Sequence, residues 1–145
     1  MKPRQTRSLR RGRGFTLVEA LVALLALSIG LLGVAALQLS GLKNNLSAAW
    51  RSQATYLAYD VIDRMRANRD RRTDYRCVQG PAPNPGGVAT TDLQAWKANL
   101  GAALPGGDGT VTVNGPDNTI VTVTVEWTDD RGSATKLSFS TTSRI

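Results

Sequence analysis

One uninterrupted apolar run near the N-terminus constrains this chain more than any other feature. Residues 15–37 read FTLVEALVALLALSIGLLGVAAL and contain a single charged residue, Glu19. As an α-helix this run would measure about 35 Å, which is enough to cross the hydrocarbon core of a bilayer. Six cations and no acid lie just before it, namely Lys2, Arg4, Arg7, Arg10, Arg11 and Arg13. By the positive-inside rule, we expect the N-terminus to stay in the cytoplasm and the chain after Leu37 to be exported.

The composition excludes several functional classes. The 145 residues carry a formal net charge of +7, but the six N-terminal cations supply most of it, so the basic charge is weak evidence for a nucleic-acid partner. There is no histidine and only one cysteine, Cys77. This excludes His-ligated zinc, nucleophile systems that need a histidine, and a disulfide within the chain. We therefore expect neither an enzyme nor a bound cofactor.

Two ordinary interpretations of the apolar run leave part of it unexplained. A cleaved secretory signal would have a small-residue cleavage site at 34–36, but its apolar region is normally about 7–15 residues long and carries no acid. A plain membrane anchor has the right length but leaves Glu19 in the bilayer without a partner. An acidic side chain there costs about 3 kcal/mol by insertion scales.

A third interpretation explains Glu19 and its neighbours together. Residues 13–19, RGFTLVE, closely resemble the processing signature of type IV pilins and type II secretion pseudopilins. The resemblance implies that a prepilin peptidase cuts between Gly14 and Phe15 on the cytoplasmic face, and that Phe15 is then N-methylated. Residues 1–14 would be the leader peptide, and the apolar helix would remain in the mature protein.

A physical role for Glu19 follows from its surroundings. Lipid tails are about as apolar as leucine, so moving an apolar helix from lipid into a bundle of similar helices gains little hydrophobic free energy. The Glu19 carboxylate would supply selectivity by pairing with the new amine of Phe15 on a neighbouring subunit, in a setting of low dielectric constant. In an isolated monomer, a Glu19 side chain that reaches the cytoplasmic interface remains an alternative.

Helical periodicity continues beyond the apolar run. Apolar residues recur at spacings of three and four at Trp50, Ala54, Leu57, Ala58, Val61, Ile62 and Met65. We expect one helix from Phe15 to about Asn68, with a transmembrane or fibre-core half over 15–39 and an amphipathic half over 40–69. Asp60 and Arg64 form a favourable i,i+4 pair on its polar side.

Residues 70–145 predict a globular head with a short helix and an antiparallel sheet. The stretch 79–91 is rich in proline and glycine and should be a loop, after which Thr91 or Asp92 would cap a helix ended by residues 105–107. Strands are expected over 110–113, over 121–127 and around residues 137–139, and residues 129–132 would connect the last two strands. The sequence thus predicts an α+β fold with a long N-terminal helix and a small sheet.

Several head residues are candidates for binding or chemistry. Asp129 and Asp130 are weak candidates for calcium, although a turn explains them as well. Cys77 would be a buried thiol, a modified thiol or an intermolecular link. The tryptophans are expected in the core, since each lies in an apolar stripe; they are Trp50, Trp96 and Trp127. Six arginines invite a nucleic-acid hypothesis, which their interleaved acids disfavour: Arg64, Arg66, Arg69, Arg71, Arg72 and Arg76.

The resemblance extends past the processing signature. Residues 23–69 resemble the PilV family of minor type IV pilins of Gram-negative bacteria, and residues 104–107 and 125–131 fit this family less specifically. The family implies the type IV pilin fold and a subunit that joins other minor pilins and the major pilin at the pilus tip. Such a subunit primes assembly, supports adhesion and twitching motility, and lies in the inner membrane with a periplasmic head before assembly. A type II secretion minor pseudopilin and a DNA-uptake receptor pilin are the alternatives.

Overall fold

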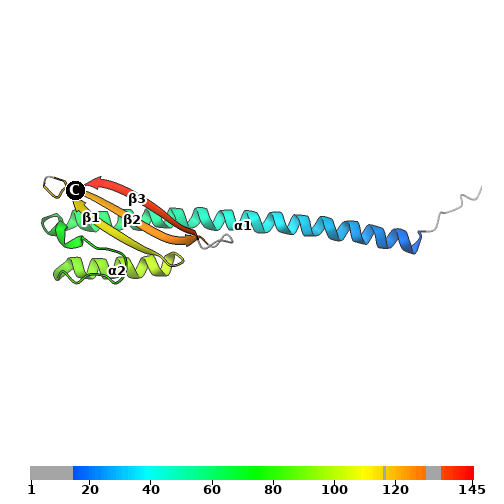
Figure 1. Ribbon diagram of the computed structural model, residues 1–145, viewed down its shortest axis with the longest axis horizontal. Helices are drawn as coiled ribbons and strands as arrows, with labels where there is room; N and C mark the ends of the chain where they lie inside the picture. Colours follow the sequence, from blue (N-terminus) through cyan, green and yellow to red (C-terminus); the bar gives the residue numbers. More distant parts are fainter. Residues whose placement is uncertain (1–14, 116, 130–134) are drawn as a thin grey trace, which may run out of the picture. The chain divides into compact units, whose positions relative to one another are not determined.

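A computed structural model describes residues 15–115, 117–129 and 135–145 of the chain (Figure 1). It divides into two compact units, Met1–Gly41 and Leu42–Ile145. The elements are α1 (Leu17–Ala67), the short 3₁₀ helix η1 (Arg69–Tyr75), α2 (Gly87–Ala103), β1 (Asp108–Asn114), β2 (Ile120–Asp129) and β3 (Thr135–Arg144). The α+β prediction is confirmed: a long N-terminal helix is joined to a small antiparallel sheet, as in the type IV pilin fold.

The predicted length of α1 is confirmed within two residues at its start and one at its end. No proline interrupts it, and its glycines at positions 30, 33 and 41 lie inside the continuous helix. Its second half carries the predicted apolar stripe, in which Ala54, Leu57, Ala58, Val61, Ile62 and Met65 are all buried. Trp50 lies at the edge of this stripe and is only partly buried.

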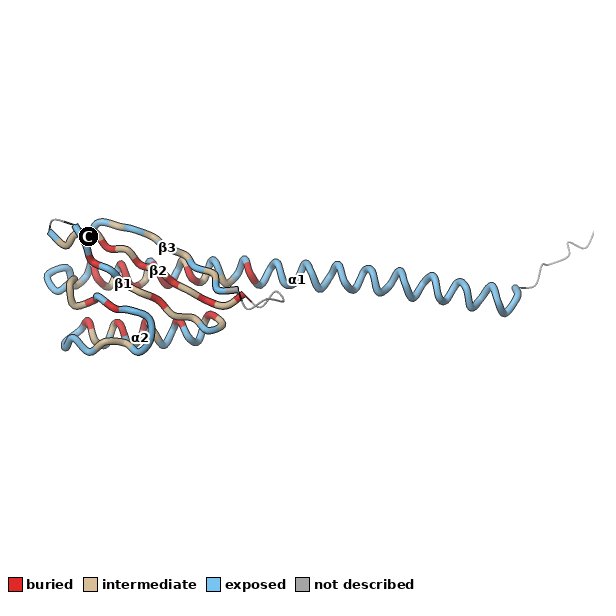
Figure 2. The backbone as a smooth tube through the Cα atoms, viewed as in Figure 1, coloured by how far each residue is buried: buried red, intermediate tan, exposed pale blue. Residues whose placement is uncertain are grey.

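The sheet has the order β1-β2-β3, and both pairs of strands are antiparallel. In the central strand, every second residue from Val121 to Asp129 is buried, as the alternation of valine and threonine predicts. The buried face of β2 joins one core with the stripe of α1 and with Trp96 of α2. Figure 2 shows buried positions along α1, α2 and the strands. The indole Nε1 of Trp96 donates a hydrogen bond to the carbonyl oxygen of Leu57 at 2.9 Å, which ties α2 to α1.

The predicted start of the short helix was wrong. α2 begins at Gly87, inside the stretch that was expected to be a loop, and neither Thr91 nor Asp92 caps it. The hydroxyl of Thr90 accepts from the amide of Gly86 at 2.8 Å and donates to the side-chain oxygen of Asn84 at 3.0 Å. These bonds, with the burial of Ala89, stabilise an additional first turn that the glycines and prolines conceal in the sequence.

The predicted strands were too short. β1 and β2 each extend beyond the expected ranges at both ends, and β3 covers ten residues around Leu137 and Phe139. Asp129, which was assigned to the connection after β2, lies within that strand and is buried. The remainder of that predicted connection, residues 130–132, falls outside the described residues.

Candidate processing and assembly site

The start of α1 is fixed by the residue that follows Phe15. The side-chain oxygen of Thr16 accepts a hydrogen bond from the amide of Glu19 at 3.3 Å, and its carbonyl accepts from Ala20 at 3.2 Å. Thr16 is therefore the N-cap, which satisfies one of the free amides of the first turn and is worth about 1 kcal/mol. Phe15 lies directly before the cap, with 77% of its surface exposed.

The cap places Glu19 in the first turn of α1, where a negative charge is favoured by the partial positive charge of the helix end. The sequence-based prediction did not include Thr16 as the cap. The signal was present, because a threonine followed three residues later by glutamate, ahead of an apolar run, is the pattern of a capping box. The segment 16–19 thus combines a helix start with the carboxylate expected to act in assembly.

The first half of α1 presents an unusually apolar surface. Every residue from Phe15 to Leu46 is exposed in the single chain. Soluble monomers rarely expose apolar patches larger than a few hundred Å². This helix is long and apolar enough to cross a membrane. The hydroxyl of Ser28 donates to the carbonyl oxygen of Leu24 at 2.7 Å, so the helix itself satisfies this polar group. Lipid or neighbouring apolar helices would have to cover the rest.

Glu19 is the only charged residue between Phe15 and Leu42. Within the described part of the chain, it forms no ion pair. A carboxylate among apolar groups is stabilised by a nearby cation, and cutting the chain after Gly14 would create an ammonium group at Phe15. Gly14 itself lies outside the described residues, so the cleavage position remains a prediction.

The N-terminal segment has a counterpart among known protein families. Residues 9–35 match the family model "Prokaryotic N-terminal methylation motif". This match supports a type IV pilin-like or pseudopilin protein, which a prepilin peptidase processes and which assembles with other pilins as a structural protein. The match ends inside the apolar run, so the methylation motif says nothing about the head. Comparisons with curated proteins and with solved structures gave no match.

Two of the six arginines singled out in the sequence, Arg72 of η1 and Arg76 directly after it, form hydrogen bonds inside the head. Arg72 donates to the carbonyl oxygens of Asn118 and Asp117 at 2.9 and 2.7 Å. Arg76 donates to the carbonyl of Val113 at 3.0 Å and to the side-chain oxygen of Asn118 at 2.8 Å. These two side chains hold the β1–β2 turn against η1. Their donors are therefore partly occupied, which weakens the argument for a nucleic-acid surface here.

A second polar cluster joins α1, η1 and α2. The predicted pair of Arg64 and Asp60 is confirmed at 3.0 Å, and Arg64 also contacts Asp92 at 3.2 Å. Burial lowers the pKa of Arg64, but its hydrogen bonds to the two carboxylates outweigh burial and raise that pKa overall. The buried Tyr75 donates its hydroxyl to Asp92, and burial, with this bond, raises the pKa of Tyr75 to about 12. Asp92, which was expected as a possible cap, therefore holds the three helices together.

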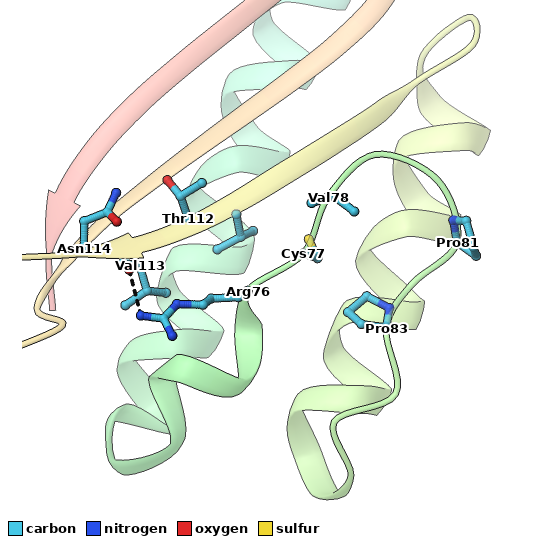
Figure 3. A pocket seen from close by; sticks show the side chains of 9 residues that line it. Arg76, Cys77, Val78, Pro81, Pro83, Thr112, Val113 and Asn114 are labelled. Atoms are coloured by element: carbon cyan, nitrogen blue, oxygen red, sulfur yellow. Dashed lines mark hydrogen bonds between the residues drawn. The ribbon is translucent and has the colours of Figure 1, made fainter.

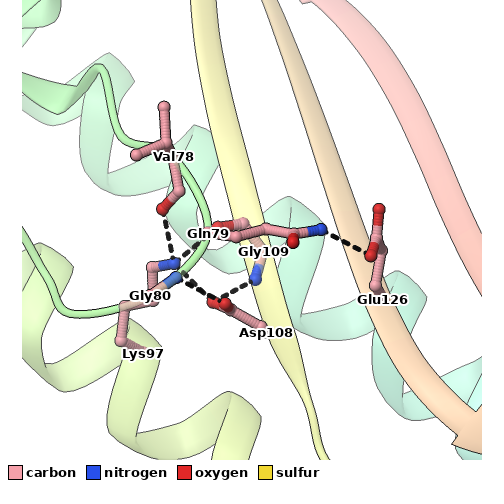
Figure 4. Close-up of polar contacts among 7 residues, drawn as sticks. All are labelled: Val78, Gln79, Gly80, Lys97, Asp108, Gly109 and Glu126. Carbon is pink, nitrogen blue, oxygen red and sulfur yellow. Dashed lines mark hydrogen bonds and ion pairs between the residues drawn. The ribbon is translucent and has the colours of Figure 1, made fainter.

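Lys97 of α2 fixes the segment that follows η1 (Figure 4). Its ammonium group donates to the carbonyl oxygens of Val78 and Gly109 at 2.9 and 2.6 Å, and it contacts the carboxylate of Asp108. Burial acts to raise the pKa of Asp108, but the bonds from Lys97 and from two backbone amides lower it overall. The side chain of Lys97 is only 9% exposed, so this cation serves the fold.

Cys77 is a buried thiol, which is one of the three states that the sequence left open. Its backbone forms an isolated bridge with Val111, with hydrogen bonds of 3.1 and 2.9 Å, and burial raises the pKa of its thiol. A groove of about 400 Å³ runs beside it along β1 (Figure 3). Arg76 and Pro83 line this groove from the chain segment that faces the strand.

The weak calcium hypothesis at the end of β2 gains no support. Asp129 is buried and accepts a hydrogen bond from the hydroxyl of Ser47 at 2.9 Å, while Asp130 lies outside the described residues. Among the residues that the structure describes, no three histidine, cysteine or acidic side chains gather as metal ligands would. Asp129 instead connects the end of β2 to α1.

Proposed function

We propose that this chain is a minor type IV pilin of the PilV family. After removal of residues 1–14 and N-methylation of Phe15, it joins other minor pilins and the major pilin at the pilus tip. There it primes assembly and supports adhesion and twitching motility. Before assembly, α1 anchors it in the inner membrane of a Gram-negative bacterium with the head in the periplasm.

One observation carries the proposal. A Thr16-capped helix starts directly after Phe15, presents Glu19 in its first turn and continues as an apolar surface that is exposed up to Leu46. The methylation motif over residues 9–35 supports the same assignment. Cleavage would create an ammonium group at the start of the helix of each processed subunit. A neighbouring subunit would offer its ammonium group to Glu19 in surroundings where an ion pair is strongly favoured.

Processing is tested by the mass and N-terminal sequence of the protein in the cell envelope. We expect the mature chain to begin with N-methylated Phe15. A chain that begins with Met1 would indicate an uncut anchor, and one that begins with Leu37 would indicate a conventional secretory signal. Either result would contradict the proposal.

Assembly is tested by substitution of Glu19. Glu19→Gln keeps the size of the side chain and removes its charge, so we expect export and head folding to be unchanged while incorporation into fibres falls about tenfold or more, equivalent to about 1.4 kcal/mol. Thr16→Val is the matched control, because it removes the cap and keeps the carboxylate. Equal incorporation of Glu19→Gln and the unmodified protein would refute the pairing argument.

The cellular role is tested by deletion of the gene, scored for twitching motility and for protein secretion. Loss of motility with normal secretion would support the minor pilin. Loss of secretion with normal motility would instead identify a type II secretion minor pseudopilin, which would share the cleavage and the role of Glu19.

A further inference from the structure

The two edges of the sheet differ in how far their outward backbone groups are bonded to the rest of the head. β1 and β3 are the outer strands, and each has one side that does not face β2 (Figure 1). On the outer side of β1, Val111 pairs with Cys77, the carbonyl of Val113 accepts from Arg76, and the carbonyl of Gly109 accepts from Lys97. Outward groups of β1 at residues 109, 111 and 113 are thus bonded within the head. The outward backbone groups of β3 have no such bonds to another described segment.

The register shows which backbone groups β3 leaves open. Val111 bonds outward to Cys77, so its neighbours at 110 and 112 bond to β2. Residues that bond to one neighbouring strand alternate with residues that bond to the other, so this pattern also determines which residues of β3 bond to β2. Residues 137, 139, 141 and 143 bond to β2, so the amides and carbonyls of residues 136, 138, 140 and 142 point outward. No backbone hydrogen bond from these groups to another described segment occurs.

Proteins normally protect such an edge with a bulge, a proline, charged side chains or a covering segment. β3 pairs with β2 over ten consecutive residues without a bulge, and it contains no proline. Seven uncharged residues, LSFSTTS, separate its two cations, Lys136 and Arg144. Both cations are exposed, and among the described residues neither forms an ion pair. The inward-facing side chains of Leu137 and Phe139 are only partly buried.

The charges of Lys136 and Arg144 determine which kind of strand can pair with β3. A second copy of β3, paired antiparallel over the whole strand, would place Lys136 opposite Arg144 at both ends, and like charges directly opposite each other are destabilising. A strand with a carboxylate at each end of the same stretch would instead form a favourable pair at both positions. Apolar side chains between them, on the inner face, would cover Leu137 and Phe139.

We propose that the open edge of β3 is a docking site for an extended strand of a different protein, with acidic residues opposite Lys136 and Arg144 and apolar residues on its inner face. Main-chain hydrogen bonds to residues 138, 140 and 142 provide affinity, as in other cases of strand addition, and the flanking charges select the partner. This inference does not depend on the role of Glu19 or on the pilus assignment.

The test uses the full-length chain in detergent micelles and a nine-residue peptide, EVTVTVTVE. N-methylation of its valine amides blocks one edge, so the peptide cannot stack into larger assemblies. An antiparallel pair of peptides through the other edge would place glutamates opposite each other, which disfavours it. We expect it to protect the amides of Ser138, Ser140 and Thr142 from hydrogen exchange, while Phe139 and Thr141, already paired with β2, change little. The matched peptide with lysine at both ends should bind at least fivefold more weakly at low salt.

Two variants of the chain test the contact directly. Ser138→Pro removes an outward amide without breaking a bond to β2, so it should weaken binding of the acidic peptide about tenfold, whereas Ser138→Ala should not. Lys136→Glu combined with Arg144→Glu should reverse the preference in favour of the lysine peptide. Equal binding of both peptides to the unmodified chain, or no protection of the outward amides, would overturn the proposal. So would self-association through β3 in the absence of peptide.

Discussion

The contact between Gly109 and Trp96 gives the sharpest test of how the head is packed. A Cβ atom added at Gly109 would lie 2.6 Å from Cη2 of the Trp96 ring, 3.0 Å from the carbonyl oxygen of Thr124 and 3.1 Å from Cδ1 of Leu100. Trp96 is fully buried, so its ring has little space to move. We therefore expect Gly109→Ala to lower the free energy of unfolding by about 1–3 kcal/mol, as overpacking does in other cores.

Trp96→Phe should also destabilise the head, for two separate reasons. It removes the hydrogen bond to the carbonyl of Leu57, worth about 1 kcal/mol. The smaller ring leaves a void of a few tens of Å³, which costs about 1 kcal/mol more at roughly 24 cal/mol per Å³. It also removes the nearest of the three atoms that the new methyl group of Ala at position 109 would meet. The double variant should therefore be more stable than the sum of the two single changes by about 1 kcal/mol or more.

The assay is urea unfolding of the full-length chain in micelles, followed by the fluorescence of Trp50 and Trp127, which all variants keep. Gly101→Ala is the control, because nothing lies within 4 Å of the added Cβ and the site is an exposed position inside α2. It should stabilise by about 0.5–1 kcal/mol and combine additively with Trp96→Phe. Additivity of Gly109→Ala with Trp96→Phe would refute the packing described here.

Three further predictions follow from the polar groups of the head. Because the pKa of Tyr75 is raised to about 12, its protonated form stabilises the fold; stability should fall between about pH 10 and pH 12, and urea unfolding of Tyr75→Phe should show a smaller fall. Arg72→Ala should speed hydrogen exchange at the amide of Asn118 about tenfold, because Arg72 donates to the carbonyl of Asn118 in the β1–β2 turn. Arg69→Ala is the control, because among the described contacts the Arg69 side chain has none with this turn. Cys77 should react with a water-soluble alkylating reagent at least about 100-fold faster in urea than in the folded chain, because its thiol is buried and its pKa raised; equal rates would contradict the burial.

The sequence predicted those parts of the fold that repeat with a regular period. The stripe of α1 recurs every three or four residues, and the alternation in β2 recurs every two, so both could be assigned from local pattern. The start of α2 could not, because Gly86 and Gly87 resemble loop residues and the turn is stabilised by the contact of Thr90 with Asn84.

The candidate site and the head likewise contain residues that a local pattern predicts and contacts that only the folded structure shows. Phe15 and Glu19 lie in one short motif that can be recognised without a structure, and Thr16 carries a capping pattern in the same segment. The partners of Arg72 lie more than 40 residues away in the sequence, so no local pattern could show that this side chain braces a turn. The open edge of β3 likewise depends on the strand order, which follows only from the folded chain.

The continuity of α1 has a mechanical consequence. The same helix that exposes the apolar residues up to Leu46 supplies Ala54, Val61 and Met65 to the core, and each of these three is completely buried. Tension applied to the N-terminal end would therefore travel along one unbroken backbone into the interior of the head. Pulling the helix out lengthwise would shear many packed side chains at once, instead of peeling them away one by one.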